Sequence, residues 1–243
     1  MAKYVINDTT LTSIADGVRK VTGTSATMKP SEMATALKNV DVSFWDKYQQ
    51  NGNRLDYSYA FAGHGWTDET FKPKYNIKPR SISYMFSVTQ ITDLCKLLDE
   101  CGVVIDLSDT VAISYFVNGS SSLQTIPTLD VSKTADLSYL ISNNSALRSI
   151  EKLILADGTQ RFSAYSFNGN PALEEIRFEG VIGSSLAIKD SPLLSSDSVQ
   201  SIIDCLKDLT GTTAQTLTLH SDVIGRMTTE QTQEIRNKNW TLA

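Results

Sequence analysis

Apolar and polar positions recur in a fixed order from residue 84 onward. In the stretch "YLISNNSAL", Tyr139 and Ile141 occupy apolar positions one and three, Asn144 a polar position six, and Leu147 an apolar position nine. The same order, whole or in part, begins again 21 to 31 residues apart at Tyr84, Tyr115, Tyr165, Leu186, Leu217 and Trp240. A period of this length predicts stacked structural repeats.

This order of residues predicts one short strand in each repeat. Residues one and three of a strand point to the same side, so stacked strands bury a continuous apolar ladder. A polar residue at position six can hydrogen-bond the backbone groups that the following turn leaves unpaired. We therefore predict an α/β fold, a leucine-rich-repeat solenoid over residues 81–243 with a parallel strand ladder and a C-terminal helix and strand as its cap.

Three stretches between the predicted strands have the periodicity of amphipathic helices. The first has Thr92 as its N-cap and Gly102 just beyond its end. The last begins with Thr228 and Gln231 in the spacing of a capping box. The three predicted helices span 91–102, 195–211 and 228–239.

The first 80 residues do not carry the repeat. Residues 9–23 and 29–40 each place apolar residues on one helical face, which predicts an N-terminal helical hairpin over residues 1–42. Short helices need tertiary packing, so this hairpin is expected to pack on the solenoid, on a partner or on another copy, and we take it as the candidate attachment segment. The candidate attachment residues are Leu11, Ile14, Val18, Met33 and Leu37. Residues 43–80 are rich in aromatic side chains and are predicted to connect the hairpin to the solenoid and cap its first repeat.

Charge and hydropathy exclude several classes of function. The net charge is −5 and the basic residues are not clustered, which argues against nucleic-acid binding. No apolar stretch approaches the roughly 18–20 residues of a membrane span, so we expect no membrane insertion. The first residues lack the pattern of a signal peptide, which favours synthesis in a cytoplasm without export. The three cysteines have no metal-ligand spacing and are interpreted as small buried apolar residues.

Both flanks of the repeats resemble a known group of proteins. "LTSIADGVRKVTGTSATMKPSEMATALKNV", "FWDKYQQNGNRLDYSYAFAGHGWTDETFKPKY" and the ending "SVQSIIDCLKDLTGTTAQTLTLHSDVIGRMTTEQTQEIRNKNWTL" are similar to tail-associated and structural proteins of phages and prophages of gut Firmicutes. In those proteins such segments flank leucine-rich repeats of the BspA-like kind, a pattern that "FNGNPALEEIRF" (167–178) also fits. The resemblance implies a virion component, made in the cytoplasm of the bacterial host, that binds other virion proteins or itself, as a homo-oligomer, through the hairpin.

The predicted strands also define a candidate binding face. If positions one and three point inward, position two and the position after three point outward. Met85, Phe116 and Leu140 then form an exposed apolar row, which is typical of an interaction surface. The alternative is that residues 1–79 cover this row. The neighbouring column suits a host surface protein or glycan and contains Ser87, Asn118, Ser142, Asn168 and Lys189.

Catalytic patterns are weak in this sequence. His64 is flanked by glycines and His220 follows a predicted strand, and neither has a carboxylate or cysteine at the spacing of a triad or metal site. Adjacent acids such as Glu174 and Glu175 are interpreted as solvated surface. We therefore predict no enzyme activity, no catalytic residue, no cofactor and no metal. The function predicted is a phage structural protein that binds a host receptor or protein, and the alternatives are a bacterial BspA-like surface adhesin or a tail enzyme acting on the cell wall.

Overall fold

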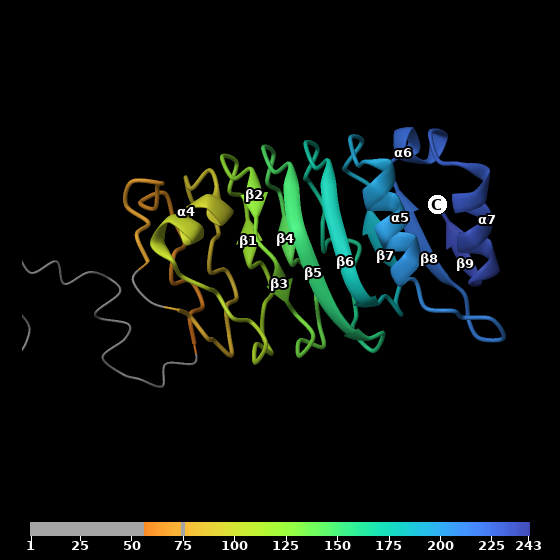
Figure 1. Cartoon of the computed structure of the whole chain (residues 1–243), viewed down its shortest axis with the longest axis horizontal. Helices are drawn as coiled ribbons and strands as arrows, with labels where there is room; N and C mark the ends of the chain where they lie inside the picture. The colour runs from red at the N-terminus through yellow and green to blue at the C-terminus, as the bar shows by residue number, and fades with distance from the viewer. Residues whose placement is uncertain (1–55, 74–75) are drawn as a thin grey trace, which may run out of the picture. The chain divides into compact units, whose positions relative to one another are not determined.

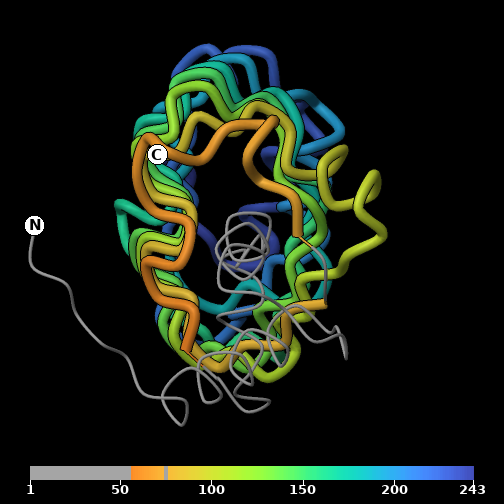
Figure 2. The backbone as a smooth tube through the Cα atoms, turned by 90° about the vertical axis from the view of Figure 1, so that its left-hand side faces the viewer, coloured from red at the N-terminus to blue at the C-terminus, as the bar shows by residue number. Residues whose placement is uncertain are grey.

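The computed structural model of this chain describes residues 56–73 and 76–243. These residues belong to one compact unit, Arg54–Ala243, in which successive stretches of chain lie side by side along the long axis (Figure 1). Seen along that axis, the stretches follow similar paths around a common interior (Figure 2). We call each such stretch a layer. Large apolar side chains fill the interior, among them the fully buried Phe61, Phe86, Phe116 and Phe167.

The strands are short, and every pair of them is parallel. β1 pairs with β4, β5 lies between β2 and β3 and also pairs with β6, and β8 lies between β7 and β9. Only β5 and β6 are longer than five residues. The strands are β1 (Val117–Asn118), β2 (Thr125–Ile126), β3 (Leu129–Asp130), β4 (Ile141–Ser142), β5 (Ser149–Asp157), β6 (Glu175–Val181), β7 (Leu186–Ile188), β8 (Gln215–Leu219) and β9 (Trp240–Leu242).

The helices of the described residues lie near the ends of the compact unit. Asp93, one residue after the predicted cap, accepts a hydrogen bond from the Lys96 amide, and the left-handed Gly102 ends that helix as predicted. The capping box of Thr228 and Gln231 is confirmed. The middle helix ends six residues before the predicted Gly211. The helices are α4 (Leu94–Cys101), α5 (Ser196–Cys205), α6 (Ser221–Gly225) and α7 (Thr229–Asn237).

The prediction of a leucine-rich-repeat solenoid with a continuous strand ladder is wrong. The described chain is an α/β structure with few helices and three separate small parallel sheets. The strands expected to begin at Tyr84, Tyr115, Tyr139 and Tyr165 are turns at those residues. The physical reason is that the two residues after each tyrosine are both buried, and successive residues of an extended strand cannot face the same side. The predicted N-terminal helical hairpin lies outside the described residues.

Residues that occupy the same position of the sequence repeat in neighbouring layers nevertheless pair through their backbones in most cases. Val117 pairs with Ile141, and Leu186 pairs with Leu217. The last alignment is displaced by two residues, since Leu217 pairs with Leu242 rather than with Trp240.

The polar residue at position six acts as predicted. Asn170 is fully buried, and its side-chain amide donates to the carbonyl oxygens of Ile141 and Phe167, each at 2.9 Å. Its Oδ1 accepts from the backbone amide of Asn144 at 3.0 Å. The residue therefore satisfies backbone groups of two adjacent layers. The equivalent residues of other layers, also buried, are Thr89, Ser120, Asn144 and Ser191.

Residues 56–73 pair with the next layer, although we expected the stacked region to begin at residue 81. The amides of Tyr57 and Phe61 donate to carbonyl oxygens of that layer at 2.8 and 2.9 Å. Phe61 and Phe71 are fully buried, and their ring centroids lie 5.1 Å apart.

Within the described ranges, no helix has the length and hydropathy that a membrane crossing requires.

Candidate functional site: a ladder of stacked tyrosines

Five tyrosines stack ring upon ring across five consecutive layers. The successive ring centroids are 4.7, 4.7, 4.5 and 5.2 Å apart, and the planes of neighbouring rings differ by 5° to 17°. The end rings have the largest exposed fractions, 61% for Tyr59 and 49% for Tyr165. We call this set the tyrosine ladder: Tyr59, Tyr84, Tyr115, Tyr139 and Tyr165.

Hydrogen bonds between layers fix the spacing of these rings. The amide of Tyr59 donates to Ser83 O at 2.9 Å, that of Tyr84 to Ser114 O at 3.1 Å, and that of Tyr115 to Tyr139 O at 2.9 Å. Hydrogen-bonded neighbouring strands lie roughly 4.7–4.9 Å apart, and the ring spacing is close to this backbone spacing. The ladder is therefore rigid before any ligand binds, because the backbone holds each ring against the next.

Four of the tyrosines have a left-handed backbone. The φ angle is 60° at Tyr59, 59° at Tyr84, and 56° at Tyr115 and Tyr139. A bulky residue in this region is an outlier that costs about 1–3 kcal/mol, whereas glycine adopts it without strain. Since four layers keep tyrosine where glycine would relieve strain, the ring contributes something that glycine cannot supply.

A neighbouring column of left-handed residues shows the usual solution. Its members follow the ladder by four residues, and three of the five are glycines. Val88 is the one apolar side chain in this column, with a φ of 59° and an exposed fraction of 36%. The column therefore offers a matched comparison for the tyrosines. It consists of Gly63, Val88, Gly119, Asn143 and Gly169.

The left-handed turn explains why the predicted apolar face is wrong. After Tyr115, both Phe116 and Val117 are buried, because the turn redirects the chain so that two successive side chains face the interior. Met85 and Leu140 are buried in the same way with 0% exposure. The three residues predicted to form an exposed row are therefore core residues, and the tyrosines predicted to be inside lie at the surface instead.

The second predicted column is only partly at the surface. Ser87 and Ser142 are buried, and their hydroxyls donate to Tyr115 O at 3.1 Å and to Asn118 Oδ1 at 3.0 Å. Asn118 and Asn168 are half-buried, and Lys189 is exposed. The Oδ1 atom of Asn168 is buried and has no hydrogen-bond partner, the only such side-chain atom among the described residues. The attachment residues Leu11, Ile14, Val18, Met33 and Leu37 lie outside the described residues.

One phenol group of the ladder, that of Tyr115, has a raised pKa. Desolvation, with a further contribution from the neighbouring Tyr139 and Tyr84, raises the pKa of Tyr115 above its usual value of 10.0. Among the described residues, no phenol oxygen is buried without a partner. The ladder therefore presents phenol hydroxyls and ring edges in a row across five layers.

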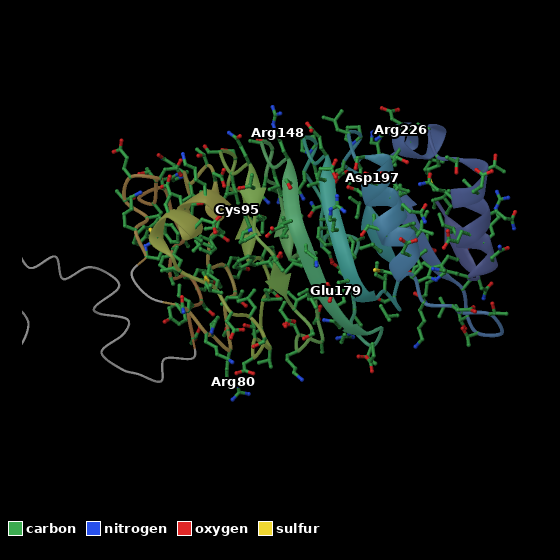
Figure 3. The ribbon with its side chains drawn as sticks, in the orientation of Figure 1. Arg80, Cys95, Arg148, Glu179, Asp197 and Arg226 are labelled. Carbon is green, nitrogen blue, oxygen red and sulfur yellow. The ribbon has the colours of Figure 1, made fainter. Side chains whose placement is uncertain are left out.

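Several titratable side chains of the described region accept hydrogen bonds from the backbone. His220 caps α6 by accepting from the Asp222 amide at 3.1 Å. A surface hollow beside α4 contains several carboxylates, but Asp68 and Asp93 accept backbone hydrogen bonds from Thr92 and Lys96. Figure 3 shows the charged side chains Arg80 and Arg148 at opposite edges of the layers, pointing outward. Residues 56–73 and 76–243 contain no group of His, Cys, Asp and Glu side chains that could hold a metal ion.

A signal for the ladder exists in the sequence, but it requires the opposite interpretation of tyrosine. "SYAF", "SYMF", "SYFV" and "SYLI" each place serine and tyrosine before two residues that are small or apolar. Two successive core residues are incompatible with the alternation of an extended strand, and this predicts a redirected backbone at the tyrosine.

Comparisons of the chain with protein-family models, with curated proteins and with solved structures found no match.

Proposed function

We propose that this chain is a non-enzymatic binding protein of a phage particle and that it recognises the host surface through the tyrosine ladder. The observation that carries the proposal is the left-handed backbone of four stacked tyrosines. Backbone strain of this kind persists where the surrounding structure enforces it, and it concentrates at functional sites. Glycine would adopt this backbone without strain, but it would lose the stacked ring.

The properties of tyrosine support a role in recognition. Its ring supplies a large amphipathic contact area with few rotatable bonds, and tyrosine is enriched in protein interfaces and in antibody paratopes. Binding normally costs about 0.5–1.5 kcal/mol for each flexible side chain that becomes fixed. In the ladder, stacking at 4.5–5.2 Å has already fixed the rings, so a ligand meets a preorganised surface.

The phage assignment is supported by the resemblance of the flanking sequences to tail-associated proteins. In this proposal residues 1–42 attach the chain to other virion proteins or to further copies of itself, and the tyrosine ladder remains available to the host. The protein is made in the cytoplasm of the bacterial host and acts in the virion. Catalysis is not part of the proposed role.

Two glycine substitutions in one layer test the role of the ladder. Tyr84→Gly removes a ring at a φ of 59°, and Val88→Gly makes the same backbone change, at the same φ, in the neighbouring column. Fluorescently labelled full-length chains are incubated with intact cells of a panel of gut Firmicutes, and bound fluorescence is measured by flow cytometry. We expect Tyr84→Gly to weaken binding by about tenfold or more, the scale of an interface hot spot. We expect Val88→Gly to bind as the unchanged chain does.

The thermal unfolding midpoint of each variant controls for folding. The proposal is overturned if two folded variants bind cells equally well, or if the unchanged chain binds no cell of the panel.

A further inference from the structure

The side chains directly beside the central tyrosines are uncharged, and charged groups lie further out. The serine that precedes each central tyrosine is half-buried, and so is Asn118, while Asn143 is exposed. The carboxylates nearest in sequence are Asp56, which accepts the Ser58 amide at 2.8 Å, and Asp136, which accepts the Ser138 amide at 2.9 Å and pairs with Arg161 at 3.5 Å. We call the uncharged surface the ladder strip: the tyrosine ladder with Ser83, Ser114, Ser138, Asn118 and Asn143.

Uncharged groups of this kind match a ligand rich in hydroxyl groups. Phenol and serine hydroxyls and asparagine amides each donate and accept hydrogen bonds, as sugar hydroxyls do. An anionic polymer would lose hydration on the ladder strip without gaining an ion partner, because the strip contains no Lys or Arg. The chemistry therefore favours a neutral polyhydroxyl ligand.

The backbone beneath the ladder strip cannot accept an extended peptide as an added strand. The amides of Tyr84, Phe86 and Val88 already donate to carbonyl oxygens of the next layer at 3.1, 2.9 and 2.8 Å. Strand addition requires a sheet edge with unpaired N–H and C=O groups. These segments face neighbouring layers rather than solvent along that direction, so a bound chain must use side-chain contacts.

The geometry of the ladder fits a linear chain. Successive rings advance by 4.5–5.2 Å along one direction, which is comparable with the length of one sugar ring in an extended glycan. The central rings cover each other's faces, and they therefore offer edges and hydroxyls. Tyr59 and Tyr165, the most exposed rings, each have one stacked tyrosine neighbour, which leaves them more open to the C–H face of a sugar.

From these observations we infer that the ligand of the tyrosine ladder is a neutral glycan chain of the host cell wall, lying lengthwise along the ladder strip. This inference rests on the proposed function, because it names the ligand class of that same surface. Binding of this glycan requires hydrogen bonds to the phenol groups of the central rings. The affinity rises with each additional sugar until the ladder is covered.

Treatment of host cells separates this inference from the proposed function. Intact cells are oxidised with periodate, which destroys sugar diols, or digested with a broad protease, before the labelled full-length chain is added. We expect binding to be lost after periodate and kept after protease. Binding that survives periodate and is lost after protease overturns the glycan ligand, while the dependence on Tyr84 leaves the proposed function standing.

Purified polymers test whether the ligand is uncharged. Neutral wall polysaccharide and wall teichoic acid from the same cells are compared by biolayer interferometry with immobilised full-length chain at low and high salt. We expect binding of the neutral polysaccharide with little dependence on salt, since no ion pair is screened. Preferential binding of teichoic acid that weakens with salt overturns the inference.

Removal of a single hydroxyl group gives the most specific test of the inference. Tyr139→Phe keeps the ring and its stacking on Tyr115 and Tyr165 and removes one hydrogen-bonding group. We expect its affinity for the neutral polysaccharide to fall by about two- to tenfold, the effect of losing one neutral hydrogen bond. Arg148→Gln changes a charge outside the ladder strip and serves as the matched control (Figure 3). Equal affinity of both variants and the unchanged chain overturns the inference.

Discussion

The tyrosine ladder and the β7–β8–β9 sheet begin from the same spacing of apolar residues and reach different backbones. In the sheet, Leu186 and Ile188 are buried and Ala187 between them is half-buried, as a strand requires. In the ladder, the tyrosine lies at the surface and the two residues after it are buried. In the three central layers the middle residue is also different, because it is large and apolar in Met85, Phe116 and Leu140 but alanine or threonine in the sheet.

In these three layers the large middle residue accounts for the left-handed backbone, whereas Tyr59 has the same backbone before Ala60. A strand with an apolar middle residue would expose it to water, at about 25 cal/mol for each Å² of apolar surface. A left-handed residue before it turns both apolar side chains inward, at a cost of about 1–3 kcal/mol. Burial of a phenylalanine or leucine outweighs or matches that cost, so the chain takes the left-handed turn.

The largest expected effect comes from truncating the middle residue in each region. Phe116→Ala removes a fully buried ring and should lower the free energy of unfolding by about 3–5 kcal/mol. Thr218→Ala, at the equivalent position of β8, should change it by less than about 1 kcal/mol because Thr218 is half-buried. Urea denaturation followed by circular dichroism measures both. Equal small effects would show that Phe116 lies at the surface and that the two regions do not differ.

The polar residue at position six gives the next effect. Asn170→Ala leaves the carbonyl oxygens of Ile141 and Phe167 and the amide of Asn144 without their present partner. Since each unsatisfied buried group costs about 1–3 kcal/mol, we expect a loss of at least about 2 kcal/mol in urea denaturation. Asp222, at position six of the β8 repeat, is exposed, and Asp222→Ala should cost far less. A stable Asn170→Ala protein would contradict the role of this side chain.

A smaller effect is expected from removing a ladder ring. Tyr115→Gly loses two stacking contacts, worth about 0.5–1.5 kcal/mol each, and relieves a strain of about 1–3 kcal/mol at a φ of 56°. The two terms nearly cancel, so the free energy of unfolding should change by no more than about 1 kcal/mol. Leu217→Ala, in β8, should cost about 2–5 kcal/mol in the same assay because Leu217 is fully buried. A Tyr115→Gly protein as unstable as Leu217→Ala would mean that the ladder serves stability rather than binding.

The smallest expected effect is a pH dependence of stability that arises from the ladder alone. The pKa of Tyr115 is raised in the folded chain, so the folded state keeps this proton where the unfolded state releases it. The resulting stability is fully present below the unfolded pKa of about 10 and is lost as the pH rises through the folded pKa. Titration of tyrosinate absorbance in the unchanged chain and in Tyr115→Phe measures the shift. If the difference between the two titrations shows that the Tyr115 phenol has a pKa at or below the ordinary value of about 10, the neighbouring rings do not raise its pKa.

The sequence was a good guide to local structure. The capping box of Thr228 and Gln231 and the helix end at Gly102 depend on neighbouring residues, and both are found. The hydrogen bonds of the position-six residue to backbone groups were also predicted, and Asn170 makes them, although its burial was not predicted. These features follow from contacts within a few residues or from a repeated position.

The candidate site could not be assigned in the same way. Alternation by itself placed Tyr115 inside and Phe116 outside, and the structure reverses the two. Tyrosine is amphipathic, so its position in a pattern does not tell which side it takes. The partners of each ring lie 24 to 31 residues away, at Tyr84 and Tyr139 for Tyr115, and only the stacking of whole layers brings them together.

By itself, then, the sequence determined where the layers recur, where three of the helices lie and which polar position bonds the backbone of the turn, because local chemistry and periodicity govern these features. Tertiary structure decided the backbone at the tyrosines, the separation into three parallel sheets and the exposure of the ladder. These depend on the balance between backbone strain in one residue and burial of its neighbours against other layers. That balance is set only when the layers are packed.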